Sequence, residues 1–543
     1  DAVGQRGGQA AAALLVFALV AAGADQQTYA LITSCIGVAW LGAIMLVRRS
    51  YVHQFRDTLR AGEIQRDVQL PNLDATTTDV LIESLSSPDE AEAMASLELL
   101  ARAGRVPALV LYHPSETIVR RALSLFAHQR RPEIAPVIEY LMDHADPLIR
   151  AAALATAARI GIHHERVVAS LADRDVDVRA AALVACAADA DRSDIVTAGI
   201  SILVGGDEAD RLALARAIAL APNARFRTLL TDLLGRREPA VVREALRVLA
   251  RSPELADVER LLGMLADPNV RNDVRRVLMA TGPRGLDRLI GALDDPRTPL
   301  NVRRHIPRTI SRFRTRAAAA SLVDRLLREP DGTTEFKILR ALGRLRSDDP
   351  QLPVDASIIR EYARRSLVDA ARYAVLADHL GPAVSPSGEL LRELLSEKRF
   401  FAIEHVFRAL DILEPTAGLR SAHDAIASSD PERRGAALEI IEHVVRSDLR
   451  NPLLAVIEPL DPQERRDRLG ELAPGPFESQ QELFAALLAD RSDSLRCVVA
   501  HHIAERNIGS LRGELARLQT LDDPPFVIDA FQQALARLKV NDA

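Results

Sequence analysis

Charged residues are absent from two stretches near the start of the chain. One stretch runs from Gly7 to Ala24 and the other covers 26–47, and the pair Arg48-Arg49 ends the second stretch. Lipid offers the backbone no hydrogen-bond partners, so an uncharged run of about 20 residues predicts a membrane-spanning helix. We therefore expect a two-helix transmembrane hairpin over 1–49, with both ends on the cytoplasmic side because arginines flank them.

Two alternatives for the same segment stay open. A cleaved signal peptide would have Arg6 as its charged region, but it would leave the run at 26–47 unexplained. A buried hairpin of a water-soluble protein would normally show a polar face, which both runs lack. Because the chain begins at Asp1 rather than Met, and glycines near its start permit close helix packing, we expect further membrane helices before it.

Residues 50–75 predict an amphipathic connector. Val52, Phe55 and Leu59 recur at three-to-four spacing and share one side of a helix. Such a helix either packs on the first unit of the following domain or lies along the membrane surface.

From residue 76 onwards, one short phrase recurs. It has a turn with Asp or Pro, then an aliphatic residue, Arg and an Ala/Leu run, and it is clearest after Asp146 (DPLIRAAAL) and after Asp175 (DVDVRAAAL). The Asp caps a helix, and a second amphipathic helix such as 134–141 lies between phrases. Adjacent copies are roughly thirty residues apart, a spacing typical of stacked helix pairs. The pattern predicts an all-α fold, an α-α solenoid that is regular over 76–345 and degenerate over 346–543.

The phrases resemble those of the HEAT-repeat family, in which Asp and Arg pair between successive units as a ladder. The resemblance implies that the recurring polar residues are structural. The functional alternative is an arginine-lined face that binds phosphates or acidic peptides. The residues assigned to the structural repeat ladder are Arg120, Asp146, Arg150, Asp175, Arg179, Arg243, Asp267 and Arg271.

The order of the N-terminal segments resembles the C-terminal end of bacterial nucleotide-carrier-like transporters of the major facilitator type that carry HEAT repeats. The matching features lie within about 9–130 and include the exit Arg48-Arg49-Ser-Tyr51 and the connector from Leu59. The resemblance implies that the transport helices precede Asp1, so no transport residue can be assigned.

Composition argues against several classes of function. The net charge is −6 and the isoelectric point is near 6.2, which does not favour nucleic-acid binding. Most basic residues are arginines, which we attribute to the base composition of the gene. The three cysteines form no C-x-x-C pair, so they indicate neither a zinc site nor a disulfide framework.

No catalytic, cofactor-binding or metal-binding motif is found in the sequence. The histidine pairs 163–164 and 501–502 are adjacent in sequence, so in a helix they point about 100° apart and do not share a metal. No phosphate-binding loop or nucleophile elbow occurs. We therefore expect a non-enzyme without cofactors.

The leading hypothesis is a non-catalytic cytoplasmic HEAT-repeat scaffold or regulatory region attached to the last helices of a transporter-like protein, which exchanges nucleotides or other solutes. The alternative is a stand-alone membrane-anchored interaction scaffold, and a solenoid enzyme is a third class. Expected partners are proteins on the concave face and the membrane, not nucleic acid, with a small-molecule solute only if a transporter precedes Asp1. The expected location is the inner membrane of a bacterium.

Overall fold

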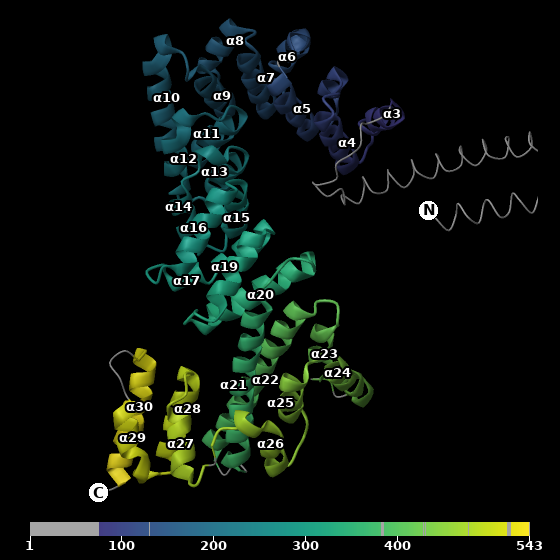
Figure 1. Cartoon of the computed structure of the whole chain (residues 1–543). Helices are drawn as coiled ribbons and strands as arrows, with labels where there is room; N and C mark the ends of the chain where they lie inside the picture. Colours follow the sequence, from purple (N-terminus) through teal and green to yellow (C-terminus); the bar gives the residue numbers. More distant parts are fainter. Residues whose placement is uncertain are drawn as a thin grey trace, which may run out of the picture. The chain divides into compact units, whose positions relative to one another are not determined.

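The computed structural model describes residues 75–129, 131–381, 385–426, 428, 430–475, 477–518 and 523–541. All regular secondary structure in these ranges is helical (Figure 1). The chain forms two compact units. The first ends at Val248 and the second begins at Leu249, so the boundary lies within α13 (Pro239–Arg251).

The first unit consists of short helices in close succession. They are α3 (Ala75–Ser84), α4 (Glu90–Arg102), η1 (Ala108–Tyr112), α5 (Glu116–Gln129), η2 (Pro132–Ile134), α6 (Ala135–Leu141), α7 (Pro147–Ile160), α8 (His164–Ala169), η3 (Ser170–Ala172), α9 (Val176–Cys186), η4 (Ala190–Arg192), α10 (Ser193–Gly205), α11 (Glu208–Leu220), η5 (Ala224–Phe226) and α12 (Arg227–Leu234).

The second unit contains longer helices as well. They are η6 (Pro253–Leu255), α14 (Val258–Met264), α15 (Arg271–Ala280), α16 (Pro283–Asp294), α17 (Leu300–Arg303), α18 (Ile306–Ile310), η7 (Ser311–Phe313), α19 (Arg316–Leu326), α20 (Gly332–Asp348), α21 (Ala356–Leu380), α22 (Pro386–Leu413), α23 (Leu419–Ile426), α24 (Pro431–Val444), α25 (Ser447–Ile457), α26 (Pro462–Leu469), η8 (Gly470–Leu472), α27 (Gln480–Leu488), α28 (Asp493–Glu505), η9 (Gly509–Leu511), α29 (Arg512–Leu518) and α30 (Pro525–Asn541).

The Asp-Pro phrases start helices as their sequence predicts. Asp146 precedes Pro147, the first residue of α7, and its carboxylate accepts the Leu148 N–H at 2.9 Å. Gly161 ends the same helix in the left-handed conformation with φ 86°, which costs glycine least. Both helix ends are thus defined by local side-chain and backbone chemistry.

Helix pairs stack in two layers within the first unit. Helices α5, α7, α9 and α11 pack side by side, while α6 covers α7 and α10 covers α11. Alanines in the centre of α7 and α9, such as Ala153 and Ala182, are fully buried, and their small size allows the close approach. The Thr156 hydroxyl lies 3.2 Å from the Leu123 carbonyl oxygen and ties α7 to α5.

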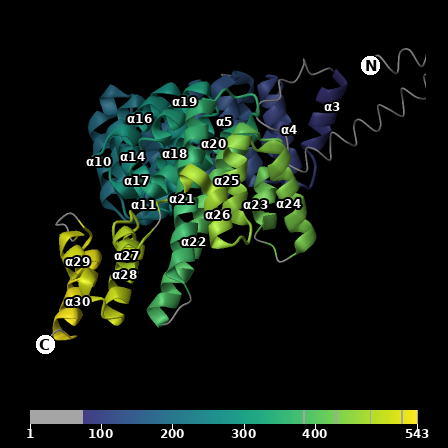
Figure 2. The ribbon, with the colours of Figure 1, turned by 60° about the horizontal axis from the view of Figure 1, so that its bottom comes forward.

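The second unit repeats this layering. Helices α14, α16, α19 and α21 form a first layer, and α18, α20 and α22 pack side by side in a second layer, which α15 joins through an Arg275–Thr309 hydrogen bond. The long helices α21 and α22 form an antiparallel pair, and Figure 2 shows α27 beside α28 and α29 beside α30. The stacked pairs confirm the all-α solenoid architecture.

The predicted fold class needs one correction, because it included a transmembrane hairpin. Within the described residues, no helix combines enough length with enough apolar character to cross a bilayer. The long helices α21 and α22 carry many charged side chains, which hydrocarbon tolerates poorly. The described residues are therefore an all-α solenoid without a membrane-spanning helix.

Several sequence-based predictions concern residues that the structure does not describe. The hairpin over 1–49 and nearly all of the connector over 50–75 lie outside the described residues. The division of the solenoid at residues 345 and 346 and the location at a bacterial inner membrane stay predictions.

The close contact between α7 and α9 gives a stability prediction. Ala182→Leu adds volume at a fully buried position of α9, and we expect it to destabilise the fold by about 1–3 kcal/mol because the neighbouring helices must move apart. The measurement is the midpoint of urea unfolding of the full chain. Ala198→Leu, at an exposed position of α10, is the control, and equal midpoints for both variants would contradict the packing argument.

Candidate functional site: a basic face on three successive helices

The aspartates assigned to the repeat ladder act at helix starts and turns. Asp146 and Asp175 cap α7 and α9, and Asp175 accepts the Asp177 N–H at 3.0 Å. Asp267 accepts the Asn269 N–H at 2.9 Å in the turn before α15. Burial, together with the charges of Asp175 and Asp146, raises the pKa of Asp177, so carboxylates of successive units lie near one another.

The arginines of the ladder donate hydrogen bonds to backbone carbonyls. Arg150 reaches the carbonyls of His144 and Ala145, at 2.9 Å each, and Arg179 makes the equivalent pair of bonds one unit later. Arg271 donates to the carbonyls of Leu265 and Ala266 at 2.6 and 2.7 Å. These bonds satisfy carbonyls of the turn before the helix.

Two other ladder arginines bond within their own helices. Arg120 donates to the Glu116 carbonyl at 3.4 Å and Arg243 to the Pro239 carbonyl at 3.2 Å. The pairing of an Asp with an Arg of the next unit stays a prediction.

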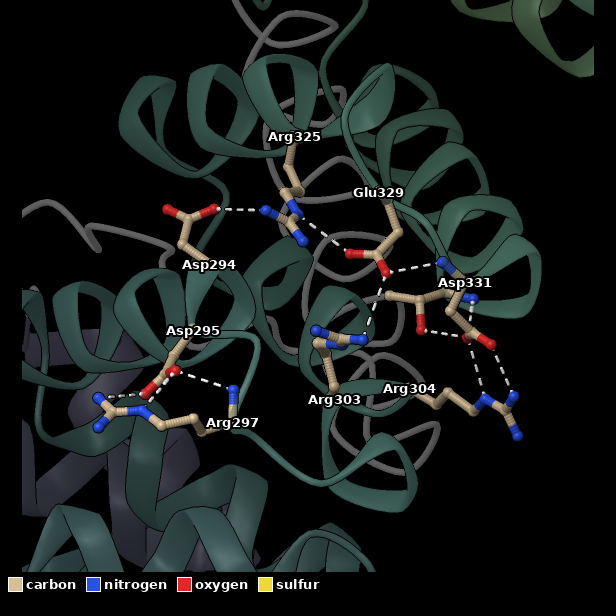
Figure 3. Close-up of polar contacts among 9 residues, drawn as sticks. Asp294, Asp295, Arg297, Arg303, Arg304, Arg325, Glu329 and Asp331 are labelled. Atoms are coloured by element: carbon tan, nitrogen blue, oxygen red, sulfur yellow. Dashed lines mark hydrogen bonds and ion pairs between the residues drawn. The ribbon is translucent and has the colours of Figure 1, made fainter. Parts of the chain in front are cut away.

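A buried carboxylate neutralises arginines around α17 and α19 of the second unit (Figure 3). Glu329, whose side chain is fully buried, lies 3.0 Å from Arg325 and 3.8 Å from Arg303. Next to it, Asp331 accepts two hydrogen bonds from Arg304, at 2.7 and 3.0 Å. The fold therefore supplies carboxylates to arginines in this region.

A different arrangement occurs on the second layer of the same unit. Basic side chains lie three or four residues apart within α15, within α20, and across α18 and η7, which follows it directly, and this spacing puts them on one side of a helix. We call this set the basic face. Its members are Arg271, Arg275, Arg308, Arg312, Lys337, Arg340 and Arg344.

The basic face lacks neutralising carboxylates. Among the residues that the structure describes, no Asp or Glu oxygen lies within 4.0 Å of a cationic nitrogen of these seven side chains. Carboxylates at the border are each paired with another arginine. These pairs are Asp273–Arg276, Asp331–Arg304, Asp348–Arg314 and Glu404–Arg408.

The cations of the three helices lie close enough to affect one another. Burial, followed by the charges of Arg308 and Arg312, lowers the pKa of Arg275 to about 10. Burial and the charges of Arg308 and Arg340 lower the pKa of Arg344 to about 10. Both side chains stay charged at neutral pH, so the face keeps an excess of positive charge.

The centre of the basic face is also partly desolvated. The Arg275 residue is only 3% exposed, and its guanidinium donates to the Thr309 hydroxyl and the Asn272 amide oxygen, which carry no charge. The Nε atom of Arg344 is buried without a hydrogen-bond partner among the described residues. A bound anion would satisfy such groups, and arginine favours carboxylate or phosphate because its planar fork matches both.

His305, at the start of α18, is also affected by the charges of the basic face. Burial, then the charges of Arg271, Lys337 and Arg275, lowers the pKa of His305 to about 4. The ring is therefore neutral at physiological pH. Burial and the charges of Arg304 and Arg271 also lower the pKa of Lys337.

A buried Ser–His contact joins α22 and α28. The Ser387 hydroxyl lies 2.7 Å from His502 Nδ1 and also contacts a Glu505 carboxylate oxygen. The carboxylate meets the hydroxyl rather than orienting the imidazole, and both Ser387 and His502 are buried. We interpret these contacts as a structural link between α22 and α28.

Metal and thiol chemistry find no support in the described part of the chain. No group of three or more His, Cys, Asp or Glu side chains able to hold a metal ion occurs there. Burial raises the pKa of the Cys186 thiol, which disfavours the reactive thiolate.

Comparisons with known proteins identify no family. No family model and no curated protein matches the chain. Among solved structures, the chain is similar to Kap121p bound to RanGTP, with 13% identity and a TM-score of 0.30 over 90% of this chain and 57% of that chain. It is also similar to UNC-45 from Drosophila melanogaster, with 14% identity and a TM-score of 0.24 over 92% and 76% of the two chains. A third similar structure is the karyopherin Kap121p bound to the SUMO protease Ulp1p, with 12% identity and a TM-score of 0.22 over 95% and 73%.

Similarities at these TM-scores assign neither a family nor a function. The chain spans only 57% of the RanGTP-bound Kap121p chain. None of the comparisons supports the resemblance of residues 9–130 to transporters.

The buried ion pairs of Glu329 give a second stability prediction. Glu329→Gln keeps the shape of the side chain but leaves Arg303 and Arg325 without their buried counter-charge, so we expect a loss of about 3–5 kcal/mol. The free energy of opening of α19 and α20, from hydrogen exchange of the full chain, measures this loss. Asp295→Asn breaks the exposed pair with Arg297 and should cost far less than Glu329→Gln, because solvent screens this pair. A loss for Glu329→Gln that is no larger than the loss for Asp295→Asn would contradict the prediction.

The depressed pKa of His305 predicts a pH dependence. The unfolded chain protonates this ring below its ordinary pKa of 6.5, whereas the folded chain resists protonation until about pH 4. The stability that His305 contributes is therefore present above pH 6.5 and is lost as the pH falls towards 4. His305→Gln should make the opening free energy of α18 less dependent on pH in this window than in the wild type. The opening free energy of α18 is compared with its value at pH 8 in each protein. If it depends on pH as strongly in His305→Gln as in the wild type, the neighbouring cations do not act on the His305 ring.

Proposed function

We propose that this chain is a non-catalytic helical-repeat scaffold that binds an acidic segment of a protein partner on the basic face. The observation that carries the proposal is the set of seven basic side chains on α15, α18, η7 and α20 with no carboxylate paired to them in the described residues. No finding on the described residues supports a link to a transporter, so the proposed ligand is a protein segment and not a solute.

The cations are held in place before any partner arrives. Arg271 is fixed by two backbone carbonyls and Arg275 by the side chains of Thr309 and Asn272. Packing and hydrogen bonding thus offset the electrostatic free energy of bringing like charges together. That free energy is spent during folding, so binding does not have to supply it. Arg308 and Arg340 are exposed and are the members best placed to meet a partner.

The border of the face favours an acidic peptide over a nucleic acid. Asp273, Asp331, Asp348 and Glu404 surround it, and a long phosphate backbone that continued past the face would approach these carboxylates. The net charge of −6 also disfavours binding of a nucleic acid. A short acidic segment avoids this repulsion.

The dimensions of the face set the length of the segment. Packed helix axes lie about 8–10 Å apart, so three helices span roughly 20 Å, which is the length of about six extended residues. A segment with several Asp or Glu residues can then place carboxylates against the arginines of each helix in turn. Bidentate Arg–carboxylate bonds fit this chemistry.

Charge reversal on the face tests the proposal. A labelled peptide of about ten residues, rich in Glu and Asp, should bind the full chain, and binding should weaken with added salt. The double variant Arg308→Glu/Arg340→Glu should lower the affinity about tenfold or more, because two attractions become repulsions. Fluorescence anisotropy measures the dissociation constant.

The control variant carries the same change of charge elsewhere in the unit. Arg284→Glu/Arg316→Glu alters two exposed arginines in the first turns of α16 and α19, where acidic residues suit the helix dipole. Its affinity should match the wild type. Equal affinity of both double variants, or displacement of the peptide by a single-stranded oligonucleotide of equal charge at lower concentration, would refute the proposal.

A further inference from the structure

A pocket of about 260 Å³ lies between α22 and α23 in the second unit. Its aromatic lining comes from Phe400, Phe407 and His423. Its charged lining consists of the arginines Arg408 and Arg420 and the carboxylates Glu404 and Asp424. The volume is below the range of about 300–1,000 Å³ typical of sites for drug-sized ligands. The pocket therefore suits one side chain better than a whole cofactor.

The aromatic walls are arranged around His423. The centroid of its ring lies 5.2 Å from that of Phe400 and 5.4 Å from that of Phe407, within the range of favourable aromatic contacts. Phe400 is 42% exposed, which is high for a large apolar residue, whereas Phe407 is buried. A further ring could stack against the exposed part of Phe400.

The same histidine carries an unsatisfied polar atom. His423 Nε2 is buried and has no hydrogen-bond partner among the described residues. A buried polar atom without a partner costs free energy, so a ligand that supplied one would gain affinity. Tyrosine and tryptophan combine a flat apolar ring with one polar group and meet both needs.

The pocket adjoins the basic face. Phe336 on α20 lies beneath both Arg340 of the basic face and Arg408 of the pocket, with guanidinium carbons 5.8 and 5.4 Å from its ring centre. A Cβ added at Gly343 of α20 would lie 3.6 Å from the Arg420 guanidinium, so α20 also meets the other side of the pocket. Helix α20 thus carries part of the basic face and also contacts the pocket residues of α22 and α23, so the two binding features adjoin one another.

From this continuity we infer that the pocket receives an aromatic side chain of the partner that lies next to its acidic segment. The inference rests on the proposed function and adds the specificity element that the basic face lacks. Charge alone selects acidic segments in general, whereas a pocket with aromatic walls and a free histidine nitrogen selects those flanked by Tyr or Trp.

Peptides of matched charge test the inference. The acidic peptide is extended by one tryptophan at either end, with leucine and alanine as the matched replacements. One of the two tryptophan peptides should bind the wild-type chain about tenfold more tightly than its alanine counterpart and more tightly than its leucine counterpart. Fluorescence anisotropy gives the dissociation constant of each peptide.

Two neighbouring phenylalanines supply a variant and its control. Phe400→Ala removes a pocket wall at a half-exposed position and should abolish the gain from tryptophan while leaving the alanine peptide unaffected. Phe401→Ala alters the next residue, which is 55% exposed and does not line the pocket, and should keep the gain. Both variants lose the Phe400–Phe401 ring contact, so the comparison isolates the pocket.

The outcomes separate this inference from the proposed function. Binding of acidic peptides with no gain from tryptophan, an equal gain from leucine, or a gain that survives Phe400→Ala would each overturn the pocket and leave the basic face in place. Absence of binding by every acidic peptide would overturn the proposed function, and the inference with it.

Discussion

Close packing of successive second-layer helices is the constraint on which the rest of the structure depends. Because equivalent positions of neighbouring units fall side by side, a side chain at a repeated position meets its counterpart in the next unit. In α7 and α9 these positions hold buried alanines, and the helices approach closely. Helices α18 and α20 also pack together, and α15 joins them through the Arg275–Thr309 hydrogen bond. There the arrangement gathers cations, and the folded chain carries the electrostatic cost.

That cost distinguishes the basic face from the rest of the unit. Around Glu329 and Asp331 the fold supplies carboxylates to Arg303, Arg304 and Arg325 (Figure 3). A short distance along the chain, Arg275 and Arg344 stay charged, largely desolvated and without a carboxylate partner in the described residues. Charges that lower stability are retained most readily where they bind something, which is the physical basis for assigning function to this surface.

Much of the architecture follows from local sequence chemistry. The Asp phrases at 146 and 175 predict helix starts, and both residues are N-caps. The basic face was not predicted, because the arginine excess was attributed to the gene's base composition. Its signal is the four-residue spacing of 271 and 275, 308 and 312, and 340 and 344 on successive second helices. No short sequence pattern predicts the aromatic pocket, because it forms only where α22 contacts α23. Its link to the basic face also depends on the position of α20. The predicted membrane hairpin rested on the length of two uncharged runs and on the arginines that flank them, and no helix in the described residues is long and apolar enough to span a bilayer.

The most direct measurement of the central claim is photo-crosslinking of the full chain to an acidic peptide with a benzophenone at its centre, followed by identification of the labelled residues by mass spectrometry. We expect cross-links to concentrate on α15, α18, η7 and α20, between residues 271 and 344, and excess unlabelled acidic peptide to remove them. Cross-links concentrated on α7 and α9, or spread evenly over both units, would contradict this claim.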